Sequence, residues 1–299
     1  MPWRLRVMHR TAFEYRETVH TSYNEVRISP LDTTSQFTLE HRVEVAPRAT
    51  LFRYRDYWGT RVHAFDLHQP HRDLVVTGHS LVETAPSDVR PHPDMSWDDL
   101  RTDAVTDRFC EYLAPSPATA VVGDVAELAR IFAALSRPAM AVDAIVAWLG
   151  DELRYTPGST DVTTTAAEVL EHRQGVCQDF AHLGLALLRG VGIPARYASG
   201  YLFPDEGSEL GSTHEGQSHA WLEAWVGEWC PSDPTSAATT VGGSDVPSGT
   251  AVERAAVGER HVVVAKGREY GDVAPLKGVV HGGGSTPAMH VSVELTRMA

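Results

Sequence analysis

The spacing of apolar residues changes from a strand period to a helical period after the first third of this chain, and the change limits the folds that it can adopt. Within residues 3–86, apolar and polar residues alternate, and β-branched and aromatic residues are frequent. In the segments 39–45, 62–67 and 73–77, apolar residues recur at about every second position, which predicts strands with one buried face. Short turn-forming segments separate them. We therefore predict an N-terminal β-sandwich over residues 1–86.

A helical period replaces the alternation after a proline-containing linker at residues 86–97. Apolar residues recur every three or four positions in the segments 125–135 and 142–153, which predicts two amphipathic helices. A third helix begins at Cys177 and ends at Gly190. Further strands are predicted at residues 195–202, 219–226, 261–265 and 290–295, and from residue 229 onward. This mixture of helices and strands predicts an α+β fold.

The length of the chain limits the number of compact units that it can form, and its net charge limits the classes of partner. With 299 residues it can form two compact units. We place the α+β core at residues 87–245 and a C-terminal β segment, packing on that core, at residues 246–299. A formal net charge of −13 argues against a nucleic-acid partner, whose binding relies on basic surface.

The cysteine content and the hydrophobic runs indicate a compartment. Three cysteines, with no Cys-x-x-Cys pair, fit a reducing environment better than a disulfide framework. The first residues lack the apolar stretch of a secretory signal, and no apolar run reaches the length of a membrane span. We expect a cytoplasmic protein with no membrane partner.

Cys177 is the strongest candidate for a reactive side chain. It stands in the segment 174–182 (QGVCQDFAH), where a polar turn leads directly into an apolar helix. The unpaired amide groups of a helix N-terminus favour the thiolate form of cysteine, which is the nucleophilic form. The alternative is a small apolar core residue, where free cysteine often lies. Cys110 and Cys230 lack this context and are predicted to be structural.

His219 follows Cys177 in the chain and is the candidate base. It begins the strand 219–226, in which Ala220 and alternate residues form an apolar face. The opposite face carries His219, Trp221 and Glu223, and this amphipathic, aromatic surface suits the floor of a cleft. The chain has 15 histidines, so an arbitrary one is more often structural than catalytic.

Asp233 is the candidate for orienting the imidazole. An Asp-Pro pair is also common in simple turns, which is the alternative. A two-residue hairpin loop before Asp233 would place it opposite Leu222, on the wrong face of the sheet. A three-residue loop at residues 226–228 would place it opposite Trp221, on the face of His219. A catalytic triad therefore predicts a three-residue loop, or a bulge with the same effect.

Two weaker patterns compete with this interpretation. Cys177, His182, His214 and His219 are ligand types for a metal, but their spacing is not typical of zinc sites, and we predict no metal. The acidic, glycine-rich segment 203–217 is either a solvated loop or a lid beside the site.

The motifs together resemble the bacterial transglutaminase-like cysteine-peptidase family. The resemblance is carried by residues 173–182, 192–201, 219–221 and 233–235. Residues 9–11 and 22–25 are similar to the N-terminal region of such proteins, and residues 260–263, 267–270 and 282–284 to their C-terminal segment. The resemblance implies a papain-like core, with helices packed on an antiparallel sheet, and acyl transfer at an amide without any cofactor.

The resemblance also implies roles for particular residues. Cys177 would be the nucleophile, His219 the base and Asp233 the orienting carboxylate. As candidates for the oxyanion donor or for substrate binding we select Gln174, Tyr155 and Trp221.

Three functions remain open at this point. We expect hydrolysis of a peptide or isopeptide bond in a peptide or protein substrate. Members of the family also transfer glutamine acyl groups to amines, or deamidate glutamine side chains. A non-catalytic scaffold that binds a protein partner is the third possibility.

Overall fold

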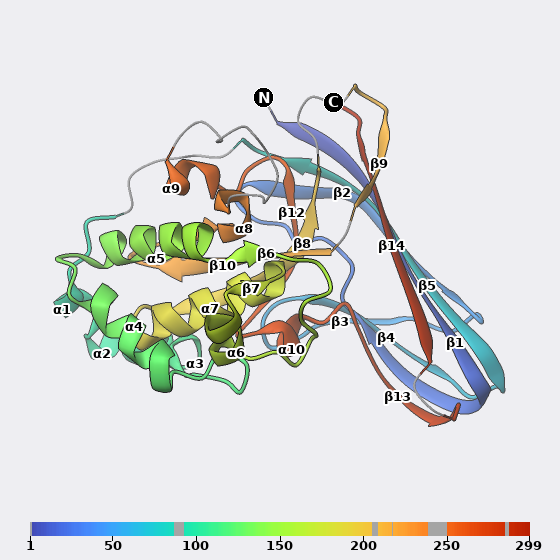
Figure 1. The fold of residues 1–299 in the computed structure, drawn as a ribbon. Coiled ribbons are helices and arrows are strands. Elements are labelled where there is room, and N and C mark those ends of the chain that lie inside the picture. The colour runs from blue at the N-terminus through green and yellow to red at the C-terminus, as the bar shows by residue number, and fades with distance from the viewer. Residues whose placement is uncertain (1, 87–92, 205–208, 217, 239–249, 285–286) are drawn as a thin grey trace.

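A large antiparallel sheet stands beside a unit of helices and a smaller sheet (Figure 1). The computed structural model describes residues 2–86, 93–204, 209–216, 218–238, 250–284 and 287–299. The strands are β1 (Trp3–Val26), β2 (Gln36–Ala46), β3 (Phe52–Arg55), β4 (Arg61–Leu67), β5 (His71–Thr84), β6 (Arg154–Tyr155), β7 (Gln174–Gly175), β8 (Ala195–Leu202), β9 (Thr213–Gly216), β10 (Ser218–Trp225), β11 (Trp229–Ser232), β12 (His261–Gly267), β13 (Leu276–Gly282) and β14 (Ala288–Arg297). The helices are α1 (Trp97–Leu100), α2 (Asp103–Arg108), α3 (Cys110–Leu113), α4 (Gly123–Ala133), α5 (Pro138–Glu152), α6 (Ala166–His172), α7 (Cys177–Gly190), α8 (Pro234–Ala237), α9 (Ala251–Arg254) and α10 (Tyr270–Val273). The predicted α+β fold class is confirmed.

The N-terminal region is rich in strands, as predicted, but its strands belong to one hydrogen-bonded sheet of eight strands. The long strand β1 is its centre. Its first part pairs with β5 and β14, and its second part, beyond a register irregularity after Glu14, pairs with β4 and β13. Apolar residues from β1, β2, β4 and β5 pack in one cluster. The sequence pattern predicted the alternation correctly, but two packed sheets and one long sheet give the same alternation.

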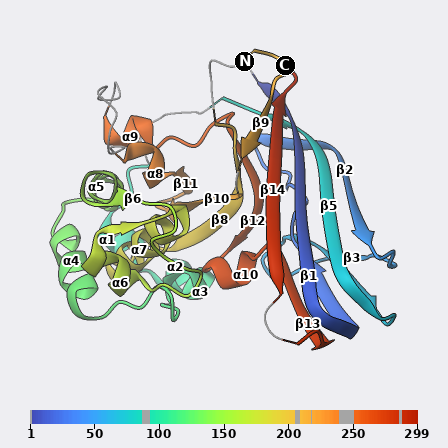
Figure 2. The same cartoon turned by 45° about the vertical axis from the view of Figure 1, so that its right-hand side comes forward.

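The C-terminal segment contacts both the core and the N-terminal strands. β12 pairs with β8 in the smaller sheet, whereas β13 and β14 pair with β1. Val293 and Leu295 of β14 are fully buried in the same cluster as the apolar residues of α7. The first and last segments of the chain therefore form one layer that contacts the core (Figure 2).

The smaller sheet holds the order β11-β10-β8-β12, and all its neighbours are antiparallel. α7 packs on one face of it, where Gly184 gives Leu222 room: a side chain at Gly184 would lie 2.4 Å from Leu222. The predicted helices at 125–135 and 142–153 are confirmed as α4 and α5. This packing fixes the start of α7 against the start of β10.

The other face of the smaller sheet borders a cavity of about 820 Å³. Trp221 and Glu223 of β10 line it, together with residues 33–36 and residues 255–258. The predicted amphipathic face of β10 is thus buried beneath other parts of the chain.

The acidic segment 203–217 contains a strand. Its residues 213–216 form β9 and pair with β14, and residues 205–208 and 217 lie outside the described residues.

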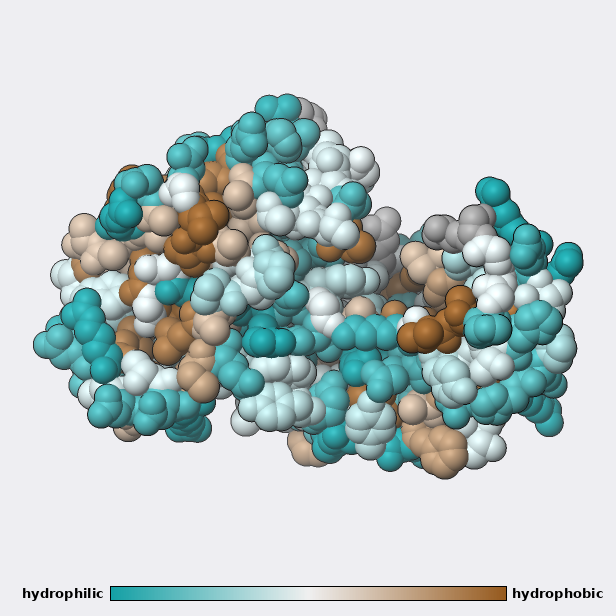
Figure 3. Space-filling view, turned by 90° about the horizontal axis from the view of Figure 1, so that it is seen from below, coloured by the Kyte–Doolittle hydropathy of each residue, from teal (hydrophilic) through white to brown (hydrophobic). Residues whose placement is uncertain are grey.

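Small groups of hydrophobic side chains alternate with hydrophilic ones on the face of the molecule seen in Figure 3. Within the described ranges, no helix has the length and apolar character needed to cross a bilayer.

Candidate active site

Cys177 is the first residue of α7, as the sequence predicts. Asp179 caps this helix end, because its carboxylate accepts a hydrogen bond of 2.7 Å from the backbone N–H of Val176. The hydroxyl of Thr160 donates to the same oxygen at 2.6 Å. Asp179 thus stabilises the start of α7. The sulfur of Cys177 therefore lies at a helix N-terminus, next to unpaired backbone amide groups.

The hairpin between β10 and β11 has the loop that a triad requires. Trp225 pairs with Trp229, and Leu222 pairs with Ser232, so the loop consists of the three residues 226–228. Gly227 has a φ of 109°, in the left-handed region that glycine adopts without strain. Asp233 follows β11 directly and is held by a backbone hydrogen bond of 2.8 Å to Ala255.

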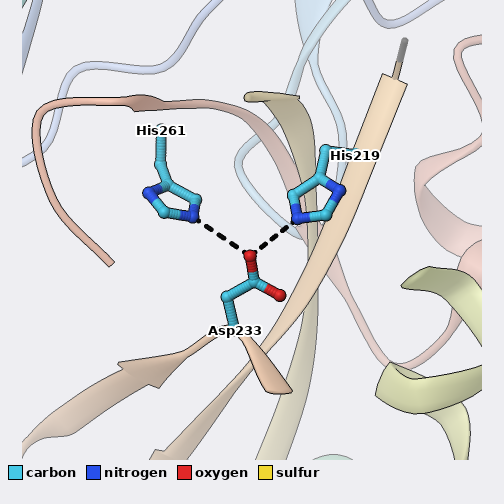
Figure 4. Close-up of side chains that lie close together, drawn as sticks. All are labelled: His219, Asp233 and His261. Atoms are coloured by element: carbon cyan, nitrogen blue, oxygen red, sulfur yellow. Dashed lines mark hydrogen bonds and ion pairs between the residues drawn. The ribbon is translucent and has the colours of Figure 1, made fainter. Parts of the chain in front are cut away.

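Asp233 and His219 form a buried pair (Figure 4). Nε2 of His219 lies 2.8 Å from Oδ2 of Asp233. Cys177 lies close enough to the same imidazole to raise its pKa. Because Nε2 faces the carboxylate, Nδ1 is the ring nitrogen left for the sulfur. The structure therefore brings Cys177, His219 and Asp233 together around one imidazole.

The electrostatics of the pair favour an imidazolium. Burial alone would lower the pKa of His219, but the charge and hydrogen bond of Asp233, assisted by Cys177, raise this pKa to about 10. Burial alone would raise the pKa of Asp233, but the charges and hydrogen bonds of His219 and His261 hold it well below its usual range. At neutral pH the group facing the thiol is thus a proton donor next to a carboxylate.

Two of the predicted oxyanion candidates lie beside Cys177. β6 and β7 pair in parallel, which places Arg154 opposite Gln174 and Tyr155 opposite Gly175, just before the helix start. Burial, followed by the charges of Cys177, Asp233 and Asp179, raises the pKa of Tyr155 to about 12. Its hydroxyl therefore keeps its proton at neutral pH. Gln174 and Tyr155 both carry hydrogen-bond donors and lie on the paired strands β6 and β7, next to the start of α7.

Trp221, the third candidate, has a different environment. Only 1% of its surface is exposed, and its ring lies near both imidazoles, with centroids 6.2 Å from His219 and 5.4 Å from His261. Its indole N–H has no hydrogen-bond partner among the described residues. The structure thus makes Trp221 a packing residue of the imidazole rather than a donor open to a substrate.

Sequence reasoning missed His261. Its Nε2 lies 3.3 Å from the same Oδ2 of Asp233 that His219 contacts. His261 begins β12, which is separated from Asp233 by a long connection and pairs with β8 rather than β10. A histidine at the start of a strand is the same local signal that selected His219, but His261 followed no motif that pointed to Asp233.

The side chains around Asp233 are of the types that bind metal ions, so we ask whether their arrangement would allow an ion to bind. His219, Asp233 and His261 have ligand atoms that all lie within 4.8 Å of one another. Both imidazoles direct Nε2 to the carboxylate, so an ion could bind only if both Nε2 atoms gave up their hydrogens. His182 instead accepts a hydrogen bond from the backbone of Tyr270, and His214 contacts Ser212, so these two histidines serve other partners.

Comparison with known proteins places the chain in a family. Residues 126–234 match the transglutaminase-like superfamily, and residues 5–83 match the bacterial transglutaminase-like N-terminal region. An uncharacterised protein of Mycobacterium leprae is 43% identical over 300 residues, covering 99% of this chain and 100% of the relative. The chain belongs to the transglutaminase-like superfamily.

Other transglutaminase-like relatives extend this likeness. An uncharacterised protein of Mycobacterium tuberculosis is 30% identical over 98% of this chain and 92% of its own length. A proposed cysteine protease from Cytophaga hutchinsonii has a crystal structure with a TM-score of 0.73 and 22% identity, over 99% of this chain and 98% of that one. That likeness supports the fold. A protein-glutamine gamma-glutamyltransferase of Pseudomonas aeruginosa is 36% identical over 75 residues, which cover 22% of this chain and 11% of that enzyme.

Proposed function

We propose that this chain catalyses acyl transfer at amide bonds, and that it hydrolyses a peptide or isopeptide bond in a peptide or protein substrate. The observation that supports this most directly is that His219 forms a hydrogen bond with the Asp233 carboxylate, while Cys177 lies near the same imidazole and raises its pKa. A sulfur nucleophile, a proton carrier and a carboxylate that orients it are the groups that this chemistry uses.

In the proposed reaction the Cys177 thiolate attacks the carbonyl carbon of the amide. The backbone N–H of Cys177, in the first turn of α7, stabilises the resulting oxyanion, with Gln174 or Tyr155 as the second donor. His219 gives its proton to the leaving amine as the C–N bond breaks, which leaves a thioester on the sulfur. Water then loses a proton to His219, attacks the thioester and releases the acid and the free thiol.

Transfer to an amine is the second candidate. The observation that favours it is the partial match to a protein-glutamine gamma-glutamyltransferase. The first half of the reaction is the same, and an amine replaces water in the second half. Hydrolysis is the first choice because water is present at high concentration and competes with any amine that reaches the thioester.

Selective alkylation tests the nucleophile. Cys110 is exposed, Cys177 is partly exposed and Cys230 is buried. If exposure alone decided reactivity, iodoacetamide would label Cys110 first. We expect Cys177 to react at least about tenfold faster than Cys110 at pH 6, because only its sulfur is paired with an imidazolium. Peptide mapping by mass spectrometry measures each rate, and slower labelling of Cys177 than of Cys110 would refute the proposal.

Trapping the acyl-enzyme separates the candidate functions. Wild-type protein incubated with cell lysate and quenched in acid should carry an acyl group on Cys177, whose mass identifies the substrate class. His219→Ala should show none, since the thiol then lacks its proton carrier. An adduct that disappears with hydroxylamine but not with added amine indicates hydrolysis. Equal cellular function of Cys177→Ala and wild type would favour the non-catalytic scaffold.

A further inference from the structure

The Asp233 carboxylate holds two imidazoles, of which the proposed reaction uses one. Its Oδ2 accepts from Nε2 of His219 at 2.8 Å, from the hydroxyl of Ser236 at 2.8 Å and from Nε2 of His261 at 3.3 Å. Its Oδ1 accepts from the N–H and the hydroxyl of Thr235, at 3.1 and 2.5 Å. Two of the three residues that hold Oδ2 are thus not in the triad.

The hydrogen position on His261 is fixed by its other neighbour. The backbone N–H of Gly258 donates to Nδ1 of His261 at 3.2 Å. An acceptor nitrogen carries no hydrogen, so the neutral ring carries its hydrogen on Nε2, which points to Asp233. The backbone N–H of His261 donates back to the carbonyl of Gly258 at 2.9 Å. This turn therefore sets both the tautomer and the direction of the ring.

The surroundings of His261 keep it neutral. Burial, chiefly, and the charge of His219 lower its pKa, although Asp233 acts in the opposite direction. Its ring packs edge-on against Trp221, with centroids 5.4 Å apart, and both residues line the cavity of about 820 Å³. His261 and Trp221 therefore stand between that cavity and the buried Asp233.

We propose that His261 is a positioning residue of the site: its Nε2–H holds Oδ2 of Asp233 in the direction of His219 and, with Trp221, keeps cavity water from that carboxylate. The inference rests on the proposed function, since it assigns a role in the reactivity of Cys177. His261 transfers no proton in the reaction. Without it, Oδ2 loses one of three donors and gains a path to solvent, and the carboxylate orients the imidazole less well.

Alkylation of Cys177 tests this inference without knowledge of the substrate. Three full-length variants are compared with wild type: His261→Phe, His261→Gln and His63→Phe. His261→Phe keeps a planar ring but removes the donor, whereas the glutamine amide restores an N–H near the position of Nε2. His63→Phe is the matched control, because His63 is 1% exposed, lies in β4 and makes no hydrogen bond among the described residues. Iodoacetamide labelling of each cysteine is followed from pH 5 to pH 10, with circular dichroism to check folding.

We expect His261→Phe to slow Cys177 labelling by about tenfold at neutral pH and to change its pH profile. His261→Gln should stay within about threefold of wild type, and His63→Phe should match wild type. An unchanged profile in His261→Phe would overturn the inference, as would equal losses in His261→Phe and His261→Gln. If wild-type Cys177 reacts no faster than Cys110, the proposed function fails first.

A spectroscopic measurement serves if His261→Phe does not fold. In wild-type protein with ¹⁵N-labelled histidine, the signal of His261 is assigned by its loss in His261→Gln. The inference predicts that this signal is that of a neutral imidazole with its hydrogen on Nε2, and that it shifts in Asp233→Asn. A His261 signal with the hydrogen on Nδ1, or one indifferent to Asp233→Asn, would overturn the inference.

Discussion

Two buried carboxylates beside the β10–β11 hairpin show how the same group serves different purposes. Asp233 follows β11 and its side chain is completely buried, and Glu223 lies in β10 with 6% of its side chain exposed. Glu223 is bound by Arg196, whose Nε lies 2.6 Å away, and by Lys266, whose Nζ lies 2.8 Å away. Asp233 is bound by two imidazoles and by hydroxyl groups. Glu223 thus faces a guanidinium and an ammonium group, whereas Asp233 faces imidazoles and hydroxyl groups.

The difference in partners decides what each carboxylate can do. A guanidinium keeps its charge at any physiological pH, so the Glu223 cluster is a fixed ion pair that ties β8, β10 and β12 together. An imidazole can give up a proton and take it back, so the Asp233 cluster can support proton transfer. Burial of a carboxylate alone does not mark a catalytic site; the chemistry of its partners does.

The largest predicted effect is on reactivity, when Asp233 is changed. Asp233→Asn removes the negative charge that orients His219 and favours its protonated form. We expect the rate of Cys177 labelling, and of any amide turnover, to fall by roughly 10²–10⁴. Glu223→Gln is the matched control, since it removes the same charge from a neighbouring buried carboxylate. Its Cys177 should react within about threefold of wild type, and a comparable loss there would show that the two clusters are not distinct.

For stability we expect the opposite order, with the larger effect from Glu223→Gln and the smaller effect from Asp233→Asn. Glu223→Gln leaves two partly buried cations against one neutral amide, and a guanidinium does not lose its charge, so we expect a loss of about 3 kcal/mol in the free energy of unfolding. Asp233→Asn leaves imidazoles that can release their protons, and should cost about 1–3 kcal/mol. Urea denaturation monitored by tryptophan fluorescence measures both. A larger loss in Asp233→Asn would contradict the assignment of Glu223 as the structural pair.

The same contrast explains what could be predicted from the sequence. Cys177 was predictable because a helix start is a local pattern, and the position of Asp233 followed from the length of one hairpin loop. His261 was not, because β12 reaches the site through its pairing with β8. The Arg196–Glu223–Lys266 cluster was missed for the same reason, since its members come from three strands.

The fold shows the same limit. The alternation of β1, β2, β4 and β5 predicted strands, and the helical periods predicted α4 and α5. β13 has almost all its residues exposed, so it lacks the buried alternation that identifies a strand. Its pairing with β1, like that of β14, joins the two ends of the chain, and a local pattern does not encode which distant strand is the partner.

The pH dependence of stability separates the two clusters further. His219 has a pKa of about 10 in the folded chain against an ordinary value of 6.5. Its imidazolium therefore stabilises the folded state fully below pH 6.5, and this contribution is lost as the pH rises to about 10. We expect the stability difference between wild type and His219→Phe to shrink between pH 6.5 and pH 10, measured by urea denaturation at several pH values. A difference that grows over this range would contradict the raised pKa.

The smallest predicted effect is at the other end of the site, where Asp179 caps the helix of Cys177. Unlike Asp233, Asp179 has an oxygen, Oδ1, with no hydrogen-bond partner among the described residues, and burial raises its pKa. Thr160→Val removes one of its two donors but leaves the N–H of Val176 in place. We expect a loss of about 1 kcal/mol in the free energy of unfolding.

Labelling of Cys177 in Thr160→Val should slow by no more than about threefold, because the helix start is held by its own backbone and by packing of α7 on the sheet. Ser159→Ala is the control, since among the described residues the Ser159 hydroxyl bonds the Thr156 carbonyl alone. Tenfold slower labelling of Cys177 in Thr160→Val would mean that the reactivity of the thiol depends on the side chains around Asp179, just as the position of the Asp233 carboxylate depends on the side chains around it. Reactivity at this site would then be sensitive to both ends of the triad, rather than chiefly to the groups that hold Asp233.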